Sequence, residues 1–182
     1  MQHIFEAARV LATSADIDIL FPVHPNPNVR AAAHAALSGN ANVHLVEPLD
    51  YFDLVQVLQR ASLVLTDSGG IQEEAPTFGV PVLVLREVTE RPEGLRTGAV
   101  RLVGTDTATI VNAAREVLAG GVAGGPSVLN PYGDGHAGER IADIVCHRLC
   151  GTERRTSDWD AVPTVDFQRM EALRQVVTGA RP

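Results

Sequence analysis

The chain has 182 residues, of which 45% are hydrophobic and 20% are charged, a composition typical of a globular domain and without a membrane-spanning apolar run. Its 15 basic residues are all Arg, because the sequence contains no Lys. The absence of Lys excludes a Schiff-base mechanism and a Walker A loop, so a phosphate must be bound by Arg or by backbone N–H groups. With 22 acidic residues the net charge is -7, which argues against a general nucleic-acid or anionic-membrane surface.

Helical and strand patterns alternate along the chain. Apolar residues recur every three to four positions in the helical segments, whereas the strand segments are short and rich in Val, Leu and Ile. In chain order we expect a helix over residues 1–11, a strand over 17–23, a helix over 29–37, a strand over 43–46, a helix over 51–61, a strand over 63–66, a helix over 71–78, strands over 81–85 and 100–103, and helices over 107–118 and 136–149. The segments 86–98 and 120–135 are expected to be loops.

The alternation of strands and helices predicts an α/β fold. The strands do not alternate between apolar and polar residues, as expected when helices cover both faces of a parallel sheet. We therefore predict a doubly wound, Rossmann-like domain over residues 1–150, with about five parallel strands and a ligand beyond their C-terminal ends. Residues 151–182 turn polar and are expected to form a linker or tail, with a last helix over 167–177.

The cysteines give no sign of a metal site. Cys146 and Cys150 lie four residues apart in an expected helix, and no further CxxC or His pair completes a zinc site, so we expect no metal. The N-terminus shows no charged, apolar and small-residue pattern of an export signal. The reducing cytoplasm is therefore the expected compartment.

The segment LVLTDSGGIQEE, residues 63–74, runs from a strand through a Gly-rich turn into a helix. Backbone N–H groups and the positive end of the helix dipole then face the C-terminal edge of the sheet. Gly69 and Gly70 let a phosphate approach this backbone, and Ser68 can either cap the helix or donate to the phosphate. Glu74 can accept two hydrogen bonds from a ribose diol. An ordinary capped helix after a buried strand is the alternative interpretation.

Two further segments follow strand ends. In REVTERPEG, residues 86–94, Arg91 precedes Pro92, which stiffens the backbone, and its guanidinium can clamp a diphosphate. A solvated loop of Arg and Glu residues is the alternative. His24 lies in FPVHPNPNV on a proline-rich turn, and a lone His of this kind is more often structural than functional. The run NPYGDG, residues 130–135, is first of all a turn signature.

Taken together, HPNPNV, EPLDYFDL, LTDSGGIQEEAPTFGVPVLVLREVTERPEG, VGTD and NPYGDG resemble the C-terminal half of the non-hydrolysing UDP-N-acetylglucosamine 2-epimerases. The resemblance runs from about Met1 to Ile144, in order and at family spacing, and is most specific from DSGGIQEE to TERPEG. It implies one half of a GT-B-like arrangement, in which two Rossmann-like domains hold the substrate between them and the C-terminal domain binds UDP.

The resemblance also implies which residues bind substrate. They are His24, Leu49, Leu54, Ser68, Gly69, Gly70, Glu74 and Arg91. Residues 68–70 would bind the diphosphate, Glu74 the ribose hydroxyls, and Arg91 would contact substrate from the opposite loop. The uracil would lie against residues 48–54, with Leu49 and Leu54 at the positions that contact it. Some relatives carry Gln and Phe at these two positions, so the assignment requires that the contacts be made by backbone atoms.

In the family, C2 of the sugar is inverted by elimination of UDP to a 2-acetamidoglucal intermediate and re-addition of UDP, without a redox cofactor. The carboxylates that act as general acid and base belong to the family's N-terminal domain, so no catalytic residue is expected in this chain. His24 fits the family's strand-end histidine, whose role stays open. Met1 falls inside what resembles a family helix, and we therefore expect activity only with a separate N-terminal half.

The first hypothesis is thus a UDP-binding half of an enzyme that interconverts UDP-N-acetylglucosamine and UDP-N-acetylmannosamine for cell-envelope polysaccharide synthesis. Its expected partner is a UDP-sugar, with no cofactor, nucleic acid or membrane, and the sequence leaves open whether the chain forms a homodimer. A non-catalytic, stand-alone module that binds UDP or a nucleotide sugar is the second hypothesis. The donor domain of a GT-B glycosyltransferase is the third, and it explains TERPEG and NPYGDG less well.

Overall fold

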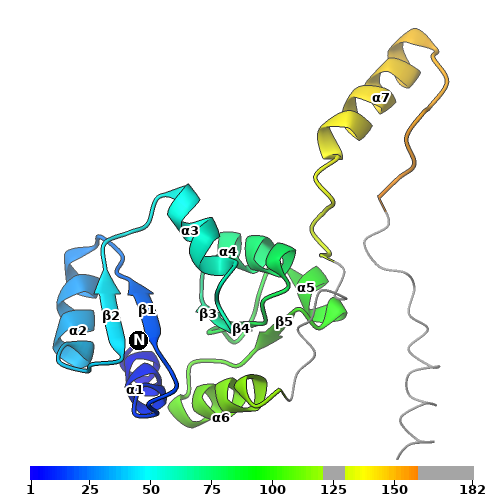
Figure 1. Ribbon diagram of the computed structural model, residues 1–182. Helices are drawn as coiled ribbons and strands as arrows, with labels where there is room; N and C mark the ends of the chain where they lie inside the picture. The colour runs from blue at the N-terminus through cyan, green and yellow to red at the C-terminus, as the bar shows by residue number, and fades with distance from the viewer. Residues whose placement is uncertain (121–129, 160–182) are drawn as a thin grey trace, which may run out of the picture. The chain divides into compact units, whose positions relative to one another are not determined.

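The computed structural model describes residues 1–120 and 130–159 of the chain. The chain forms two compact units that divide between residues 128 and 129, and each is considered by itself. In chain order, the first unit contains α1 (Gln2–Leu11), β1 (Ile19–Pro22), α2 (Pro27–Leu37), β2 (Val43–Val46), α3 (Tyr51–Leu58), β3 (Val64–Thr66), α4 (Gly69–Glu74), the 3-10 helix η1 (Ala75–Phe78), β4 (Val82–Val84), α5 (Pro92–Thr97), β5 (Val100–Leu102) and α6 (Thr107–Leu118) (Figure 1). The second unit contains α7 (Ala137–Cys150).

The strands of the first unit pair in parallel, in two ladders. In the first ladder, β1 pairs with β2 and Ile19 lies opposite Val43. In the second, β4 lies between β3 and β5, and Val82 is opposite both Val64 and Val100. A helix lies in each connection between paired strands, as parallel pairing requires. The predicted α/β fold with parallel strands is confirmed, with the strands divided between two ladders.

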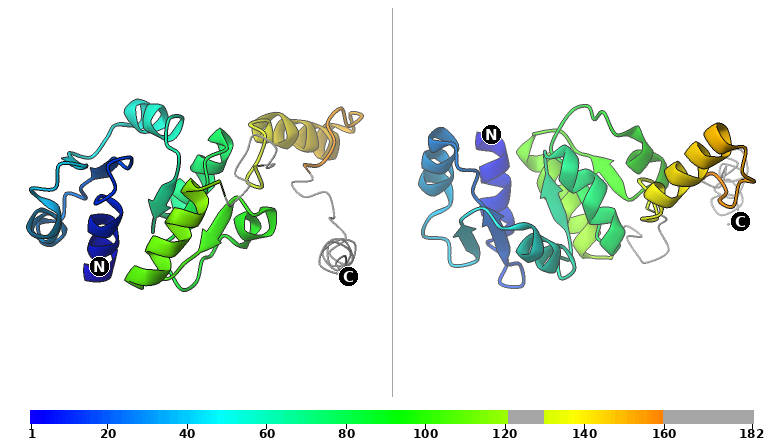
Figure 2. Two further views of the ribbon diagram at one scale, coloured as in Figure 1. Left: turned by 60° about the horizontal axis from the view of Figure 1, so that its bottom comes forward. Right: turned by 90° about the horizontal axis from the view of Figure 1, so that it is seen from above.

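The central strand β4 is buried on both faces. Alternate residues of a strand point to opposite sides, so Val82 and Val84 pack in a cluster with Leu58 of α3, whereas Leu83 packs with Ile110 of α6. Each of the three β4 side chains is at most 2% exposed. Helices α1 and α6 lie side by side and share the Leu83 cluster (Figure 2). The loops that follow the strands are therefore attached to a sheet whose two faces are both covered by packed side chains.

Two segments differ from the sequence prediction. The expected loop over 86–98 contains α5, whose start is marked by Pro92 at the first helical position and whose end is marked by Gly98 at a φ of 74°. The helix expected over 71–78 begins earlier, at Gly69, and continues as the 3-10 helix η1 from Ala75. Pro76 accounts for this change, because it lacks the N–H that an α-helix would need.

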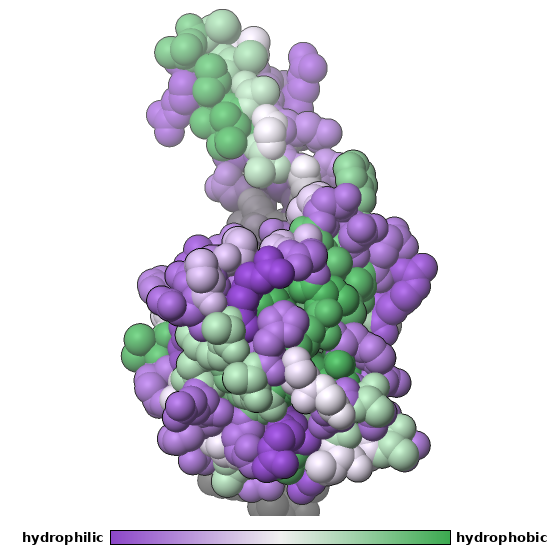
Figure 3. All heavy atoms as spheres, turned by 90° about the vertical axis from the view of Figure 1, so that its left-hand side faces the viewer, coloured by the Kyte–Doolittle hydropathy of each residue, from purple (hydrophilic) through white to green (hydrophobic). Residues whose placement is uncertain are grey.

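Helix α7 carries an apolar stripe that the described part of the chain leaves exposed. Its members are Ile141, Ile144, Val145 and Leu149, which are between 36% and 80% exposed. Figure 3 shows hydrophobic residues gathered on this helix. The sequence places α7 in a domain ending at residue 150, whereas in the structure α7 belongs to the second unit, because periodicity shows which residues share a face and not what covers it. The domain boundary at residue 150 stays a prediction.

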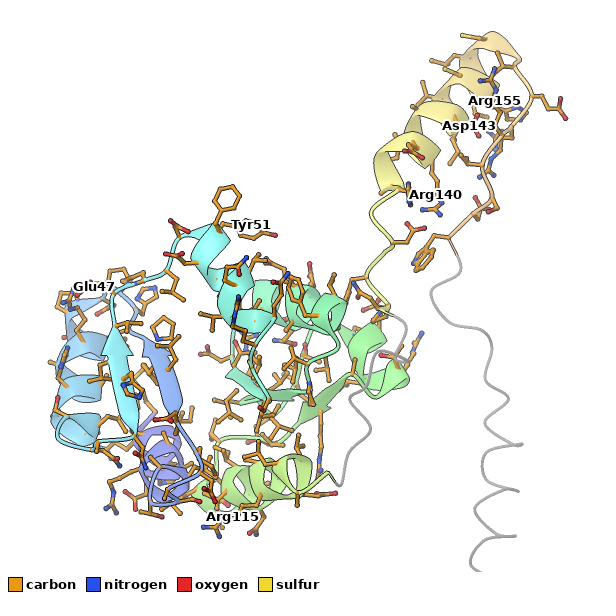
Figure 4. All side chains as sticks on the ribbon, viewed as in Figure 1. Glu47, Tyr51, Arg115, Arg140, Asp143 and Arg155 are labelled. Atoms are coloured by element: carbon orange, nitrogen blue, oxygen red, sulfur yellow. The ribbon has the colours of Figure 1, made fainter. Side chains whose placement is uncertain are left out.

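Residues 152–159, here called the strap, fold back along α7. Asp143 Oδ2 accepts hydrogen bonds from the backbone N–H groups of Arg155 (2.9 Å) and Thr156 (2.8 Å) and from the Thr156 hydroxyl (2.7 Å). Figure 4 shows Asp143 and Arg155 on facing sides of the helix and the strap. These hydrogen bonds, that of the Thr156 side chain foremost, hold the pKa of Asp143 below its ordinary value of 3.8.

A second contact attaches the end of the strap. Arg140 donates to both carboxylate oxygens of Asp134 at 2.7 Å and to the Ser157 carbonyl at 3.2 Å. Its guanidinium lies 5.5 Å from the centroid of the Trp159 ring. The segment after α7, expected to be a linker or tail, is therefore attached to the helix as far as residue 159, and the helix expected over 167–177 lies outside the described residues.

Acidification is expected to release the strap. Because the folded-state pKa of Asp143 is lowered, its stabilising contribution is complete above pH 3.8 and is lost as the pH falls through the lower folded-state value. Trp159 is the only Trp in the chain, so its fluorescence reports on the strap. We expect a constant emission from pH 7 to pH 4 and a change below.

The substitution Asp143→Ala separates the effect of this carboxylate from the effects of Asp134 and Asp158. The pKa values of these two residues are also lowered, by Arg140 and Arg154 respectively. It should shift the Trp159 emission at pH 7, whereas Asp16→Ala, in an exposed turn of the first unit, should not. The attachment by Asp143 would be refuted by wild-type emission in Asp143→Ala at neutral pH.

Candidate functional site

The segment that follows β3 enters α4 without a side-chain cap. Ser68 is the N-cap residue, but its side chain makes no capping hydrogen bond, and its backbone N–H donates to Thr66 Oγ1 at 3.0 Å. Within residues 1–120 the backbone N–H groups of Gly69 and Gly70 have no acceptor. Of the two roles expected for the Ser68 hydroxyl, helix capping is therefore absent, and its Oγ is exposed beside two N–H donors.

Ser68, Gly70 and Glu74 converge on one point. The position that a Cβ atom would take on Gly70 lies 3.7 Å from Glu74 Oε1 and 3.9 Å from Ser68 Oγ. The spacing of four residues places Glu74 on the same face of α4 as Gly70. The other carboxylate oxygen, Oε2, is buried and has no hydrogen-bond partner among the described residues. An unsatisfied buried acceptor costs about 1–3 kcal/mol, which a donated hydrogen bond would recover.

Arg91 reaches the same loop from the connection between β4 and β5. Its guanidinium packs so closely on Gly69 that a Cβ there would lie 2.8 Å from Arg91 Cζ. Gly69 does not have a positive φ, so glycine is required here for close approach and not for backbone conformation. Arg91 Nε donates to Glu73 Oε1, and Nη1 lies 3.6 Å from Glu90. The structure thus brings Arg91 together with residues 68–74.

The other expected residues lie on different elements. His24 is exposed after β1, and its Nδ1 accepts a hydrogen bond from the Asn26 N–H at 3.2 Å. A neutral imidazole in this position carries its proton on Nε2, which is then a donor. Leu49 is half-buried between β2 and α3, and Leu54 packs on the cluster beneath α3. Among the described residues no hydrogen bond or ion pair connects these three with residues 68–74, so their role in the site stays a prediction.

A pocket of about 380 Å³ lies where β4 and β5 end. It is lined by Arg86, Glu87, Thr109 and residues 102–106, and by none of the expected substrate-binding residues. Asp106, in the VGTD segment, accepts hydrogen bonds from Thr109 N and Thr109 Oγ1, both at 2.9 Å. The bond from the Thr109 backbone is the main cause of the lowered pKa of Asp106. The segment after β5 therefore caps α6.

Three residues beside Arg91 were missed by sequence reasoning. Glu73 holds its guanidinium, and Thr89 Oγ1 donates to Gln72 Oε1 at 2.7 Å. Gln72 is completely buried, and a buried polar side chain normally has a hydrogen-bond partner. A polar residue on the inner face of α4 is therefore the feature that could have indicated this contact. A helix of six residues is too short for its periodicity to show which face is buried.

Comparison with known proteins identifies the family. The model of the UDP-N-acetylglucosamine 2-epimerase family matches residues 1–146. The chain belongs to this family. It is 43% identical over 151 residues to the UDP-N-acetylglucosamine 2-epimerase of Bacillus subtilis, an alignment that covers 79% of this chain and 38% of that protein. The chain therefore spans less than half the length of this curated family member.

Two solved structures of similar proteins support the same assignment. The S. aureus protein MnaA, in a co-structure with UDP, matches with a TM-score of 0.80 and 40% identity, over 87% of this chain and 44% of that one. The Neisseria meningitidis UDP-GlcNAc 2-epimerase bound to UDP-GlcNAc matches with a TM-score of 0.74 and 39% identity, over 79% of this chain and 40% of that one. The resemblance found in the sequence and the Rossmann-like, GT-B type of fold are confirmed.

Residues 1–120 and 130–159 contain neither a membrane-spanning helix nor a cluster of metal ligands. No helix there is long and apolar enough to cross a membrane. Over residues 1–120 and 130–159, no group of three or more His, Cys, Asp or Glu side chains is placed to hold a metal ion.

The close approach of Arg91 to Gly69 gives a prediction. The substitution Gly69→Ala should displace the guanidinium, which is the far end of a flexible side chain, and change the unfolding free energy by less than about 1 kcal/mol. The displacement is measured by the ¹H–¹⁵Nε NMR signal of Arg91 and the stability by urea unfolding. In the matched control Gly70→Ala the new Cβ meets only ordinary contacts, so the Arg91 signal should stay. An unmoved signal in Gly69→Ala would contradict the described packing.

Proposed function

We propose that this chain is the UDP-binding half of a UDP-N-acetylglucosamine 2-epimerase. The observation that carries the proposal is the Glu74 carboxylate, whose buried Oε2 lacks a partner among the described residues and whose Oε1 lies beside the Gly70 backbone. A carboxylate accepts hydrogen bonds only, so the group it calls for is a donor such as a ribose diol. The S. aureus relative in complex with UDP supports a uridine nucleotide as the source of that diol.

The diphosphate would bind between Ser68 and Arg91. The N–H groups of Gly69 and Gly70 are donors without an acceptor within residues 1–120, and the Ser68 hydroxyl lies next to them. Arg91 supplies the positive charge, in a chain where Lys is absent. Because Glu73 binds Nε, the planar guanidinium has a fixed orientation, which suits the forked recognition of a phosphate.

The uracil and the sugar would extend toward the first ladder. We infer that the uracil lies against Leu49 and Leu54 and contacts their backbone atoms. His24 would donate from Nε2 to the substrate, because its Nδ1 already accepts from Asn26. These placements follow from the family resemblance and from the tautomer that the Asn26 contact selects.

Turnover would need carboxylates from outside this chain. Inversion at C2 requires a general acid and a general base as UDP is eliminated and added back. In the site described here, Glu73 is paired with Arg91, and Glu74 is assigned to the ribose. A separate N-terminal half is therefore the proposed partner in catalysis, and no cofactor is called for. The full reaction proposed for the assembled enzyme interconverts UDP-N-acetylglucosamine and UDP-N-acetylmannosamine.

Calorimetry with UDP tests the binding site. Arg91→Ala removes the cation beside the diphosphate and Glu74→Ala removes the acceptor for the ribose. Each loss of a charge-assisted hydrogen bond should weaken UDP binding on the order of tenfold or more. The control Arg115→Ala removes an Arg of the same charge that is exposed on α6 (Figure 4), and it should bind UDP as the wild type does. Wild-type affinity in both site variants would reject the proposed site.

Product analysis tests whether catalysis requires the N-terminal half. The chain alone, incubated with UDP-N-acetylglucosamine in D₂O, should give no UDP-N-acetylmannosamine and no deuterium at C2, because it supplies no general base. Adding the separately expressed N-terminal half of the Bacillus subtilis relative should start both, with the intact relative as the positive control. Turnover by the chain alone, followed by ¹H NMR, would show that its own residues complete the reaction.

A further inference from the structure

Gln72 is an unusual residue in the buried part of α4. Its side chain is 0% exposed, and it is the one buried polar side chain among the described residues. Its Oε1 accepts from Thr89, but its Nε2 has no hydrogen-bond partner among those residues. An apolar side chain of similar length, such as Met, would avoid the unsatisfied donor. Stability of the fold therefore does not explain a Gln at this position.

The Oε1 contact of Gln72 has a consequence for Arg91. Thr89 Oγ1 donates to Gln72 Oε1 at 2.7 Å and accepts from the backbone N–H of Arg91 at 3.1 Å. These two bonds form one chain from the buried face of α4 to Arg91, the N-cap residue of α5. Each bond in such a chain polarises the next, and both lie in a partly buried setting where they are strong. The backbone position of Arg91 is thus set by Gln72 through Thr89.

The side chain of Arg91 is oriented by Glu73, the residue next to Gln72 in α4. Glu73 follows Gln72 directly and accepts from Arg91 Nε. Helix α4 consequently fixes Arg91 through two contacts. Gln72 fixes its backbone through Thr89, and Glu73 fixes its guanidinium. Both constraints place the guanidinium on Gly69, where a Cβ would collide with it.

We propose that Gln72 and Thr89 are positioning residues that hold Arg91 against Gly69, so that its guanidinium meets the diphosphate of a bound uridine nucleotide. The inference rests on the proposed function, because it assigns the purpose of the network to UDP binding. It goes beyond it by assigning a role to two residues that lie behind the ligand and do not touch it. A buried polar residue kept at a cost to stability is typical of such a role.

The test measures binding of UDP and of uridine, which lacks the diphosphate. Thr89→Val and Gln72→Met should each weaken UDP binding about tenfold, while uridine binding, measured by ligand-observed NMR, stays unchanged. The conservative Thr89→Ser keeps the hydroxyl and should keep wild-type UDP affinity. The melting temperature of Gln72→Met should stay close to that of the wild type, because removal of the unsatisfied Nε2 offsets the loss of the acceptor for the Thr89 hydroxyl.

A double-mutant cycle with Arg91→Ala separates positioning from general damage. If Thr89 acts through Arg91, adding Thr89→Val to Arg91→Ala should cause no further loss of UDP affinity. A further loss there, or equal losses for UDP and uridine, would overturn the proposal. So would wild-type UDP affinity in Thr89→Val. If Gln72→Met does not fold, the cycle at the half-buried Thr89 still decides the question. Failure of the wild type to bind UDP at all would instead reject the proposed function.

Discussion

The burial of β4 on both faces is the constraint on which the rest of the first unit depends. Val82 and Val84 close the core under α3, and Leu83 closes the core shared with α1 and α6. The pairing of β3 with β4 then fixes the positions at which both strands end, with Thr66 opposite Val84. Because Ser68 follows the first of these ends and Arg91 the second, the hydrophobic core determines where the two polar loops meet.

The features that could be predicted from the sequence are those determined by consecutive residues. The helix over residues 107–118 and the strand over 43–46 have the expected bounds, the helix because Asp106 supplies its N-cap. The passage from a strand through Ser68 into a helix was likewise predicted from one short segment, although α4 already begins at Gly69. The contact between Gln72 and Thr89 spans 17 residues of sequence and exists only because β3 and β4 pair in one register, so no local pattern showed it. The helix α5 was missed because its polar composition outweighed the signals at its two ends.

The use of Arg as the sole cationic side chain changes what the loops must do. A Lys ammonium can turn toward a phosphate from many directions, whereas a planar guanidinium must be presented edge-on to form two parallel hydrogen bonds. An Arg in a solvated loop would lose rotamer freedom on binding, and that loss reduces affinity. Because Arg91 is paired with Glu73 and packed on Gly69, its rotamer freedom is already restricted in the free protein. The alternative interpretation of REVTERPEG as a simple solvated loop is thereby disfavoured.

Two of the unsatisfied buried side-chain atoms in the described residues belong to α4, namely Gln72 Nε2 and Glu74 Oε2. A helix of six residues that contains two such atoms and has no side-chain cap is poorly stabilised by its own sequence. It persists because Ile71 packs against the β4 core and Ala75, which directly follows the helix, is part of that core. Conflicts between local preference and fold are expected at binding sites, where polar groups are held ready for a ligand. Both conflicts lie in the helix that begins with Gly69 and Gly70, and the Glu74 carboxylate lies beside Gly70, which is an argument for a ligand at this loop that is independent of family resemblance.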